Sequence, residues 1–282
     1  MLNRAIRGQA VPGLRVRCLC VIYGFAALHP GYALTPASGK KMPSKKIAWI
    51  TGGGTGMGLA GAKELAKDGW TVVVSGRRAD VLEHAVKETG SSASAVVLDV
   101  ANKADVERAA QEIIGKHGRI DLLVNSAGLN VPNRRFADMT TEGWDKVVRV
   151  NLDGLLYCML AVLPTMRAQQ SGTIINVSSW AGKLPSKVSG AAYAATKHAV
   201  VSLTHSFNTE EFRNGLRACA LCPGEAATEI LKLRPVQPTD EEKARMLQPE
   251  DIGRTIAFVA NMPQHVCINE ILMSPTWNRS YL

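Results

Sequence analysis

Aromatic residues and long apolar segments are scarce in this chain. Phe, Trp and Tyr make up 5% of its 282 residues, and the apolar run CLCVIYGFAAL covers only residues 18–28. A helix that crosses a bilayer needs about 20 apolar residues, so no segment after residue 45 is expected to span a membrane. Six cysteines in a chain of this length do not suggest a disulfide framework. The 46% hydrophobic and 20% charged residues are ordinary for a globular protein of one or two domains.

Acidic residues are absent from the first 46 positions. Eight of the 33 lysines and arginines lie there, so the remaining residues hold 25 basic against 24 acidic side chains. The formal net charge of +9 therefore belongs to the N-terminal segment and not to the folded body. Because nucleic acids and anionic membranes are bound by basic surfaces, neither is expected as a partner of the folded domain.

The basic N-terminal segment has three interpretations. Its arginines and the run at 18–28 resemble the start of a secretory signal, although the small-residue cleavage pattern is poor. The Arg-rich, acid-free composition also fits an organelle transit peptide. We favour a third interpretation, in which translation begins at Met42, shortly before the first expected strand. We therefore predict an extension at 1–42, one domain at 43–282 and a cytoplasmic location, with export and organelle import as the alternatives.

Cys219 and Cys222 form a C-x-x-C pair, a spacing that also occurs in redox and zinc sites. They stand in the run RACALC at 217–222, which we expect to be a strand, where residues three apart point to opposite faces. No second pair of ligands follows at zinc-like spacing, and the six histidines show no metal-like cluster. The pair is predicted to be buried packing, and no metal site is expected.

Short β-rich runs alternate with helical patterns from residue 46 onward, which is typical of a parallel sheet with helices on both faces. The expected strands cover 46–50, 71–75, 94–99, 121–125, 173–178, 217–222 and 270–274. The expected helices lie near 57–68, 79–89, 103–117, 141–169, 190–213 and 249–260. The predicted fold class is α/β: a doubly wound, Rossmann-type, seven-stranded parallel sheet in a single domain.

The first expected strand runs directly into the glycine-rich stretch TGGGTGMG at 51–58, and a helical pattern follows. Glycines at such a turn let the backbone approach a pyrophosphate, and the helix N-terminus adds N–H donors and positive potential. The pattern is T-G-x-x-x-G-x-G, formed by Thr51, Gly52, Gly56 and Gly58. Its place between the first strand and the first helix of an α/β run predicts a dinucleotide site.

Further motifs follow in the sequence: LDV at 98–100, NSAG at 125–128, Asn151 in RVNLDG, NVSS at 176–179, Tyr-x-x-x-Lys at 193–197 and PGEAAT at 223–228. With the glycine-rich turn, these signals resemble the short-chain dehydrogenase/reductase family, in its single-domain type, over residues 46–275. The resemblance implies an NAD(P)-dependent oxidoreductase that acts on CH–OH groups, with a small-molecule carbonyl or alcohol as substrate. It also implies a homodimer or homotetramer, paired through the helices at 141–169 and 190–213.

The resemblance implies a catalytic set of Asn151, Ser179, Tyr193 and Lys197. Tyr193 and Lys197 are four residues apart in an expected helix, and therefore lie on one face. A tyrosine has an ordinary pKa near 10, and an ammonium about 4 Å away favours the phenolate by roughly 4 kcal/mol at an effective dielectric near 20. Lys197 is therefore predicted to lower the pKa of Tyr193, the general acid and base. The serine would orient the substrate oxygen, and the asparagine would take part in a proton relay through a water.

The assignment of the serine depends on one residue of spacing. By the family's usual distance from the tyrosine, the serine would fall on Trp180. The stretch SSWAG, however, matches the family pattern with its second serine as the catalytic one. We therefore predict Ser179, on the assumption of a one-residue insertion in KLPSKVSG, with Ser178 as the alternative.

The end of the second expected strand, VVVSGRR, bears on the choice of cofactor. NAD-specific members carry an acidic residue there for the ribose 2′-hydroxyl, whereas this chain has Gly76 followed by Arg77. A guanidinium suits a 2′-phosphate, so NADP is predicted, with NAD as the alternative. The predicted cofactor-binding residues are Thr51, Gly52, Thr55, Gly56, Met57, Gly58, Arg77, Asp99, Val100, Asn125, Ala127, Gly128, Tyr193, Lys197, Pro223, Gly224 and Thr228. Asp99 is expected at the adenine, and Asn125 is expected to stabilise the central strand.

The sequence does not name the substrate. Residues 228–247 stand where this family carries a mobile substrate lid, but their charges are mixed. Arg134 and Arg135, after the fourth expected strand, either attract an anionic substrate or are ordinary exposed loop residues. The alternative function is a catalytically silent nucleotide-binding sensor or interaction subunit. The intact tyrosine and lysine argue against it.

Overall fold

The computed structural model describes residues 45–234 and 236–278, so the predicted extension at 1–42 lies outside the described residues. The strands are β1 Ile47–Thr51, β2 Thr71–Gly76, β3 Ala93–Val97, β4 Leu122–Asn125, β5 Gly172–Val177, β6 Leu216–Pro223 and β7 Glu270–Met273. They form one seven-stranded sheet in the order β3-β2-β1-β4-β5-β6-β7, and every pairing is parallel. Each predicted strand is present, and the predicted fold class is confirmed.

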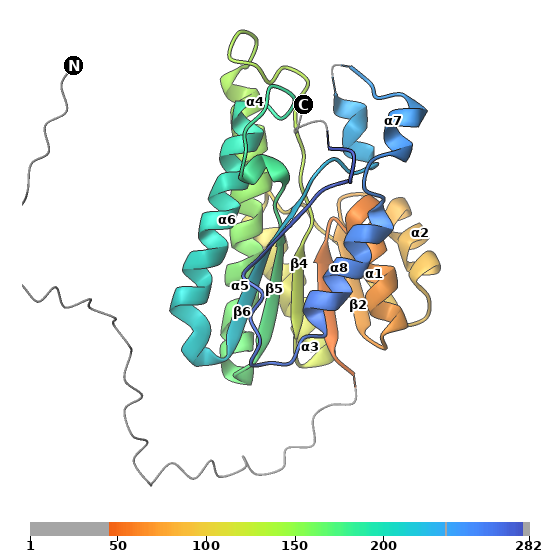
Figure 1. Ribbon diagram of the computed structural model, residues 1–282. Helices are drawn as coiled ribbons and strands as arrows, with labels where there is room; N and C mark the ends of the chain where they lie inside the picture. Colours follow the sequence, from red (N-terminus) through yellow and green to blue (C-terminus); the bar gives the residue numbers. More distant parts are fainter. Residues whose placement is uncertain (1–44, 235, 279–282) are drawn as a thin grey trace, which may run out of the picture. The chain divides into compact units, whose positions relative to one another are not determined.

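Helices cover both faces of the sheet. They are α1 Gly56–Lys67, α2 Ala79–Thr89, α3 Lys103–His117, α4 Thr141–Val148, α5 Gly154–Gln169, α6 Ala191–Glu211, α7 Asp240–Ala244 and α8 Pro249–Ala260. Successive strand residues point to opposite faces, so β1 contributes to two apolar layers. Ile47 and Trp49 belong to the layer with α3, α5 and α6, whereas Ala48 and Ile50 belong to the layer with α1, α2 and α8. Figure 1 shows α5 and α6 on one side of the sheet and α1 and α8 on the other.

The helix predicted at 141–169 is interrupted in the structure. Between α4 and α5 the chain forms a π-helical turn at Arg149–Asp153, with Asn151 at its centre. Such turns are rare and are frequently found at functional sites. By length and composition alone, the stretch Thr141–Gln169 is sufficient to cross a membrane. In this domain, α5 is a core helix whose buried residues pack in the layer with α3 and the sheet.

The predicted lid contains structure that the sequence did not indicate. A 3₁₀ turn at Glu229–Leu233 follows β6, and the short helix α7 comes next. Thr239 and Glu242 cap α7 reciprocally, since the Thr239 hydroxyl accepts from Glu242 N and the Glu242 carboxylate accepts from Thr239 N. In Figure 1 the lid stands beyond the carboxyl ends of the strands. It is therefore placed over the edge of the sheet where a ligand is expected.

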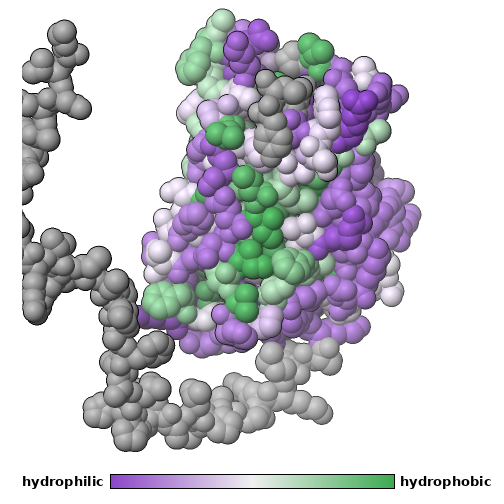
Figure 2. Space-filling model, in the orientation of Figure 1, coloured by the Kyte–Doolittle hydropathy of each residue, from purple (hydrophilic) through white to green (hydrophobic). Residues whose placement is uncertain are grey.

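Strand β7 forms an edge of the sheet and is only partly covered. Leu272 in β7 and Phe258 in α8 are 45% and 53% exposed. In the space-filling view, apolar residues form a strip over this side of the molecule, between surfaces that are mainly hydrophilic (Figure 2). On the side of the molecule seen in Figure 2, the surface near β7 is therefore more apolar than its surroundings.

Close packing between α1 and α8 makes a testable prediction. A Cβ on Gly253 of α8 would lie 2.8 Å from the backbone of Ala60 in α1. We expect Gly253→Ala to lower the free energy of unfolding by about 1–3 kcal/mol, because the helices must move apart. Gly115→Ala in α3 is the control: a Cβ there meets no atom within 4 Å, and the change should raise stability by roughly 0.5–1 kcal/mol. Equal stability of the two variants in urea unfolding would contradict the packing argument.

Candidate active site

A cleft of about 920 Å³ lies at the carboxyl edge of the sheet. The turns after β1, β2, β4, β5 and β6 line it, together with residues of α6 and of the lid. In open parallel sheets, ligands bind at this edge where the strand order reverses, and here the reversal lies between β1 and β4. The cleft is therefore at the position where the fold places a ligand.

The glycine-rich turn brings three pieces of backbone together. Gly52 has a φ of +65°, and a Cβ there would lie 2.7 Å from Ala127 N, in the turn after β4. A Cβ on Gly58, in the first turn of α1, would lie 2.3 Å from Gly52 O. Thr55 precedes α1 but makes no capping hydrogen bond with its side chain. The result is a side-chain-free cradle at the start of α1, and it fits a pyrophosphate.

Most of the predicted cofactor-binding residues line this cleft: Gly52, Thr55, Gly56, Met57, Arg77, Asp99, Val100, Ala127, Gly128, Tyr193, Lys197, Pro223, Gly224 and Thr228. Gly58, Thr51 and Asn125 do not; the last two are buried in β1 and β4. Asn125 donates from Nδ2 to Asn176 Oδ1 in β5, at 2.9 Å. It links two central strands, which is the structural role expected from the sequence.

Tyr193 and Lys197 lie one turn apart near the start of α6, and both line the cleft. The Lys197 side chain turns inward: the residue is 4% exposed, and Nζ donates to Val177 O at the end of β5, at 2.7 Å. Nζ lies 5.6 Å from the centroid of the Tyr193 ring. Burial lowers the pKa of Lys197 to about 8. At neutral pH the group is thus still mainly an ammonium, next to the phenol.

The pKa of Tyr193 moves in the direction opposite to the one predicted. Burial raises it, while a hydrogen bond with Ser179 and the positive charges of Arg234 and Arg134 oppose the rise. The physical reason is that removal from water penalises the phenolate more than these groups favour it.

The two candidate serines have different environments. Ser178 is 2% exposed, and its hydroxyl donates to the backbone carbonyl of Lys197 at 2.8 Å. The Ser179 hydroxyl accepts from Ala181 N at 3.1 Å and is hydrogen-bonded with the Tyr193 phenol. The structure therefore brings the Ser179 hydroxyl to the Tyr193 phenol, whereas the Ser178 hydroxyl is bound to the backbone of α6.

Asn151 supports the site without lining the cleft. Its Oδ1 accepts from Leu129 N at 2.8 Å, and its Nδ2 donates to Leu129 O at 2.9 Å. A Cβ on Gly128 would lie 3.5 Å from Asn151 Oδ1 and 3.7 Å from Lys197 Nζ. The amide thus fastens the π-helical turn to the chain after β4, close to the lysine.

Two arginines contribute to the cleft. Arg134 is 6% exposed, so it is not the ordinary loop residue that one interpretation expected, whereas Arg135 is exposed. Arg234, in the lid, forms an ion pair with Glu225 at 2.8 Å. Arg234 and Glu225 were not singled out from the sequence, because only the fold brings them to the tyrosine. Trp180 also lines the cleft.

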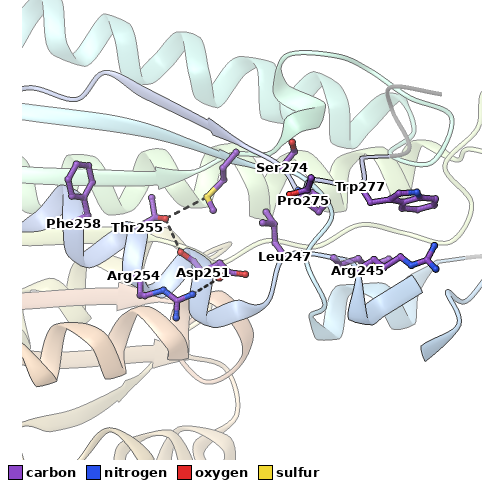
Figure 3. Close-up of a pocket in the computed structure, with 12 residues that line it drawn as sticks. Arg245, Leu247, Asp251, Arg254, Thr255, Phe258, Ser274, Pro275 and Trp277 are labelled. Atoms are coloured by element: carbon purple, nitrogen blue, oxygen red, sulfur yellow. Dashed lines mark hydrogen bonds and ion pairs between the residues drawn. The ribbon is translucent and has the colours of Figure 1, made fainter. Parts of the chain in front are cut away.

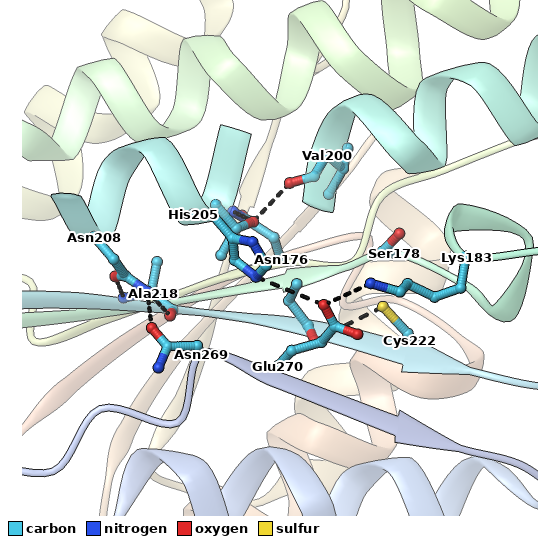
Figure 4. Close-up of polar contacts among 12 residues, drawn as sticks. Asn176, Ser178, Lys183, Val200, His205, Asn208, Ala218, Cys222, Asn269 and Glu270 are labelled. Atoms are coloured by element: carbon cyan, nitrogen blue, oxygen red, sulfur yellow. Dashed lines mark hydrogen bonds and ion pairs between the residues drawn. The ribbon is translucent and has the colours of Figure 1, made fainter. Parts of the chain in front are cut away.

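The C-x-x-C cysteines are buried in β6 on opposite faces of the sheet. Cys219 packs in the layer with α8, and Cys222 packs against Val201 of α6. Burial raises the pKa of Cys219 to about 12, which disfavours a thiolate. Figure 4 shows Cys222 beside Ser178, with Lys183 and His205 directed toward Glu270 of β7. Within residues 45–234 and 236–278, no group of His, Cys, Asp and Glu is arranged to hold a metal ion.

A second cleft, of about 740 Å³, lies between α8, the chain after β7 and the lid. Arg245 stacks over the ring of Trp277 at 5.3 Å, and Figure 3 shows the two side chains next to each other. Arg254 and Asp251 form an ion pair on α8 at 2.5 Å. None of the predicted catalytic residues lines this second cleft. The chemistry expected from the sequence therefore belongs to the larger cleft.

Known proteins resemble this chain over nearly the whole domain. The short chain dehydrogenase profile matches residues 46–237. An uncharacterised oxidoreductase of Staphylococcus epidermidis is 32% identical over 231 residues, which cover 82% of this chain and 97% of that protein. A serine dehydrogenase, solved in its closed form with NADP+, is 30% identical with a TM-score of 0.74, over 81% of this chain and 94% of that one. A 3-ketoacyl-(acyl-carrier-protein) reductase of Brucella melitensis, solved with NADH, is 29% identical with a TM-score of 0.73, over 80% of this chain and 95% of that one.

The buried ammonium of Lys197 makes stability depend on pH. Its folded pKa of about 8 lies below its ordinary 10.5, so the unfolded chain binds more protons between these values. The cost of the charge is fully present below pH 8 and is relieved as the pH rises through this window. We expect the free energy of unfolding to rise by about 2 kcal/mol up to about pH 9.5, relative to Lys197→Met. Urea unfolding between about pH 7 and about pH 9.5 measures this, with exposed Lys146→Met as the control. Parallel profiles for the wild type and Lys197→Met would refute it.

Proposed function

The chain belongs to the short-chain dehydrogenase/reductase family of oxidoreductases, and we propose that it transfers a hydride between a nicotinamide cofactor and a small alcohol or carbonyl compound. One observation carries the proposal. Tyr193, Lys197 and Ser179 line the same cleft as the glycine-rich turn. A packed tyrosine–lysine pair would not need a buried amine or a cradle of glycines. Similar solved proteins support both directions, since one is a serine dehydrogenase and another is a 3-ketoacyl-(acyl-carrier-protein) reductase.

Proton transfer is the work of the chain's own residues. A nicotinamide bound in the cleft supplies the acceptor or donor of the hydride. In oxidation, Tyr193 as phenolate takes the proton of the substrate hydroxyl while the C–H bond breaks and the C=O bond forms. In reduction, the phenol returns that proton to the oxygen. Ser179 hydrogen-bonds the same oxygen and orients it.

Lys197 and Asn151 support this proton transfer without contacting the reacting oxygen. The Lys197 ammonium favours the phenolate electrostatically, because its charge is held close to the ring in a site with little water. Asn151 holds Leu129 and Gly128 near the amine, which supports a role in relaying the proton from the active site. Asn151 is thus a positioning residue in this proposal.

We propose NADP as the preferred cofactor. Arg77 follows Gly76 at the end of β2 and lines the cleft, and among the described residues it forms no ion pair. Relatives have been solved with NADP+ and with NADH, so the family alone does not decide between them. A guanidinium at this position, in place of a carboxylate, favours the 2′-phosphate.

Assembly and location also belong to the proposal. We expect a homodimer or homotetramer paired through α4, α5 and α6, where Leu160 of α5 is 52% exposed. We also propose a cytoplasmic location for the domain.

Replacement of the tyrosine tests the chemistry. We expect Tyr193→Phe to lower kcat by about 10²–10⁴-fold with any alcohol or carbonyl that the wild type turns over, because the general acid and base is removed. Binding of NADP+ should change little. Turnover is followed by the absorbance of the reduced nicotinamide, and Tyr157→Phe in α5 is the control. Activity that survives in Tyr193→Phe would remove the assigned acid. Cofactor binding without turnover in the wild type would favour the silent sensor.

Replacement of the arginine tests the cofactor preference. We expect Arg77→Gln to weaken NADP+ binding by about ten- to hundred-fold, because a charge-assisted contact to the phosphate is lost. NAD+ binding should stay within about three-fold of the wild type. Calorimetric titration measures both, with Arg149→Gln, exposed and paired with Asp153, as the control. Equal losses for the two cofactors would contradict the assignment.

A further inference from the structure

Arg134 is an unusual residue for the wall of a cleft. It is 6% exposed, and its guanidinium donates to three backbone carbonyls: Val131 O at 2.8 Å, Val188 O at 3.0 Å and Leu233 O in the lid. All three acceptors are neutral, and no carboxylate of the described residues forms an ion pair with it. A buried charge is normally paired with an opposite one. These three hydrogen bonds use three of the five guanidinium N–H groups, so two N–H groups can still donate to a ligand.

Arg234 brings a second guanidinium to the same place from the lid. Its side chain is 15% exposed, lines the cleft and pairs with Glu225. Burial lowers the pKa of Arg134, and the nearby positive charge of Arg234 lowers it further. Both arginines also act on the Tyr193 phenol. Two guanidinium groups, only one of them paired with a carboxylate, therefore lie near the reacting hydroxyl.

From this arrangement we infer that the substrate is a small hydroxy acid or oxo acid, whose carboxylate binds to Arg234 and Arg134 while its hydroxyl or carbonyl reacts at Tyr193. The inference rests on the proposed function and adds the substrate class to it. A carboxylate supplies the negative charge that the neutral partners of Arg134 do not. Guanidinium groups also match carboxylates in geometry, through paired N–H donors.

The shape of the cleft fits a small acid. Trp180, Leu184, Val188 and Leu233 line the same part of the cleft and can cover the carbon chain. The dinucleotide and the reacting part of the substrate would share this cleft of about 920 Å³. Arg217 in β6 is also buried and also donates only to neutral oxygens, but it does not line the cleft. Arg134 differs because it lines the cleft together with Tyr193 and Arg234.

The test compares an acid with its neutral ester. The protein is saturated with NADP+, and the affinities for lactate and 3-hydroxybutyrate are compared with those for their methyl esters. Binding is read from the rise in Tm, and turnover from the absorbance of NADPH. We expect the wild type to bind at least one acid about ten-fold or more tightly than its ester. High salt should weaken binding of the acid and leave that of the ester unchanged.

Variants of Arg234, in the lid, test whether its positive charge binds the carboxylate of the acid. Arg234→Gln should weaken binding of the acid by about ten- to hundred-fold and that of the ester by less than about three-fold. Arg234→Lys should retain part of the preference. The double variant Glu225→Gln/Arg234→Gln should behave like Arg234→Gln, which shows that the loss comes from the missing cation and not from an exposed carboxylate. Arg254→Gln, on α8 outside this cleft, is the control.

The outcomes separate the two proposals. The inference is overturned if the wild type binds acids and esters equally, if Arg234→Gln weakens both equally, or if no acid binds while NADP+ does. In each case the proposed function stands as long as Tyr193-dependent turnover of a neutral alcohol or ketone is found. Absence of NADP+ binding would instead remove the proposed function itself.

Discussion

The burial of the Lys197 ammonium is the interaction on which the site depends. Taking a charge out of water costs several kcal/mol, so the surrounding structure must hold it firmly. The Lys197 amine donates to Val177 O at the end of β5, and the backbone carbonyl of Lys197 accepts a hydrogen bond from the Ser178 hydroxyl. A Cβ on Gly182 would lie 2.7 Å from that carbonyl, so the chain after β5 packs directly against α6. The lysine is therefore fixed at both its backbone and its amine, and its position relative to Tyr193 follows from the helix.

The electrostatics of the cleft follow from this burial. The same removal from water that lowers the pKa of Lys197 raises that of Tyr193, so the protein alone keeps the phenol protonated. A protonated phenol is the form that donates to a carbonyl, whereas oxidation of an alcohol requires the phenolate. Arg134, Arg234 and the hydrogen bond from Ser179 all favour the phenolate. Positive charge in the cleft therefore serves both the reacting oxygen and, in our inference, the acid group of the substrate.

Much of the dinucleotide half of this architecture was predictable from sequence, because local patterns determine it. Runs of β-branched residues predict strands, and the glycines at 51–58 predict a turn with close backbone contacts, which Gly52 and Gly58 make. The four-residue spacing of Tyr193 and Lys197 fixes their common helical face. Local patterns do not determine the π-helical turn at Asn151, which a pair of hydrogen bonds holds to Leu129, more than twenty residues earlier in the chain. The direction of the Tyr193 pKa was wrong for a similar reason, since spacing reveals a neighbouring charge and not the extent of burial.

The substrate half is built differently, and this difference limits what a sequence reveals. A backbone cradle binds phosphate wherever the fold recurs, since it needs only glycine and a helix start. In our proposal, the substrate would be held by side chains from the loop after β4, the turn after β5 and the lid, which meet only in the folded chain. Arg134 illustrates this: its three carbonyl partners come from those three segments, and the most distant in sequence is Leu233. From the sequence alone, a residue with such contacts is interpreted as a solvated loop arginine. Its place in the cleft, next to Tyr193 and Arg234, is what points to an anionic ligand.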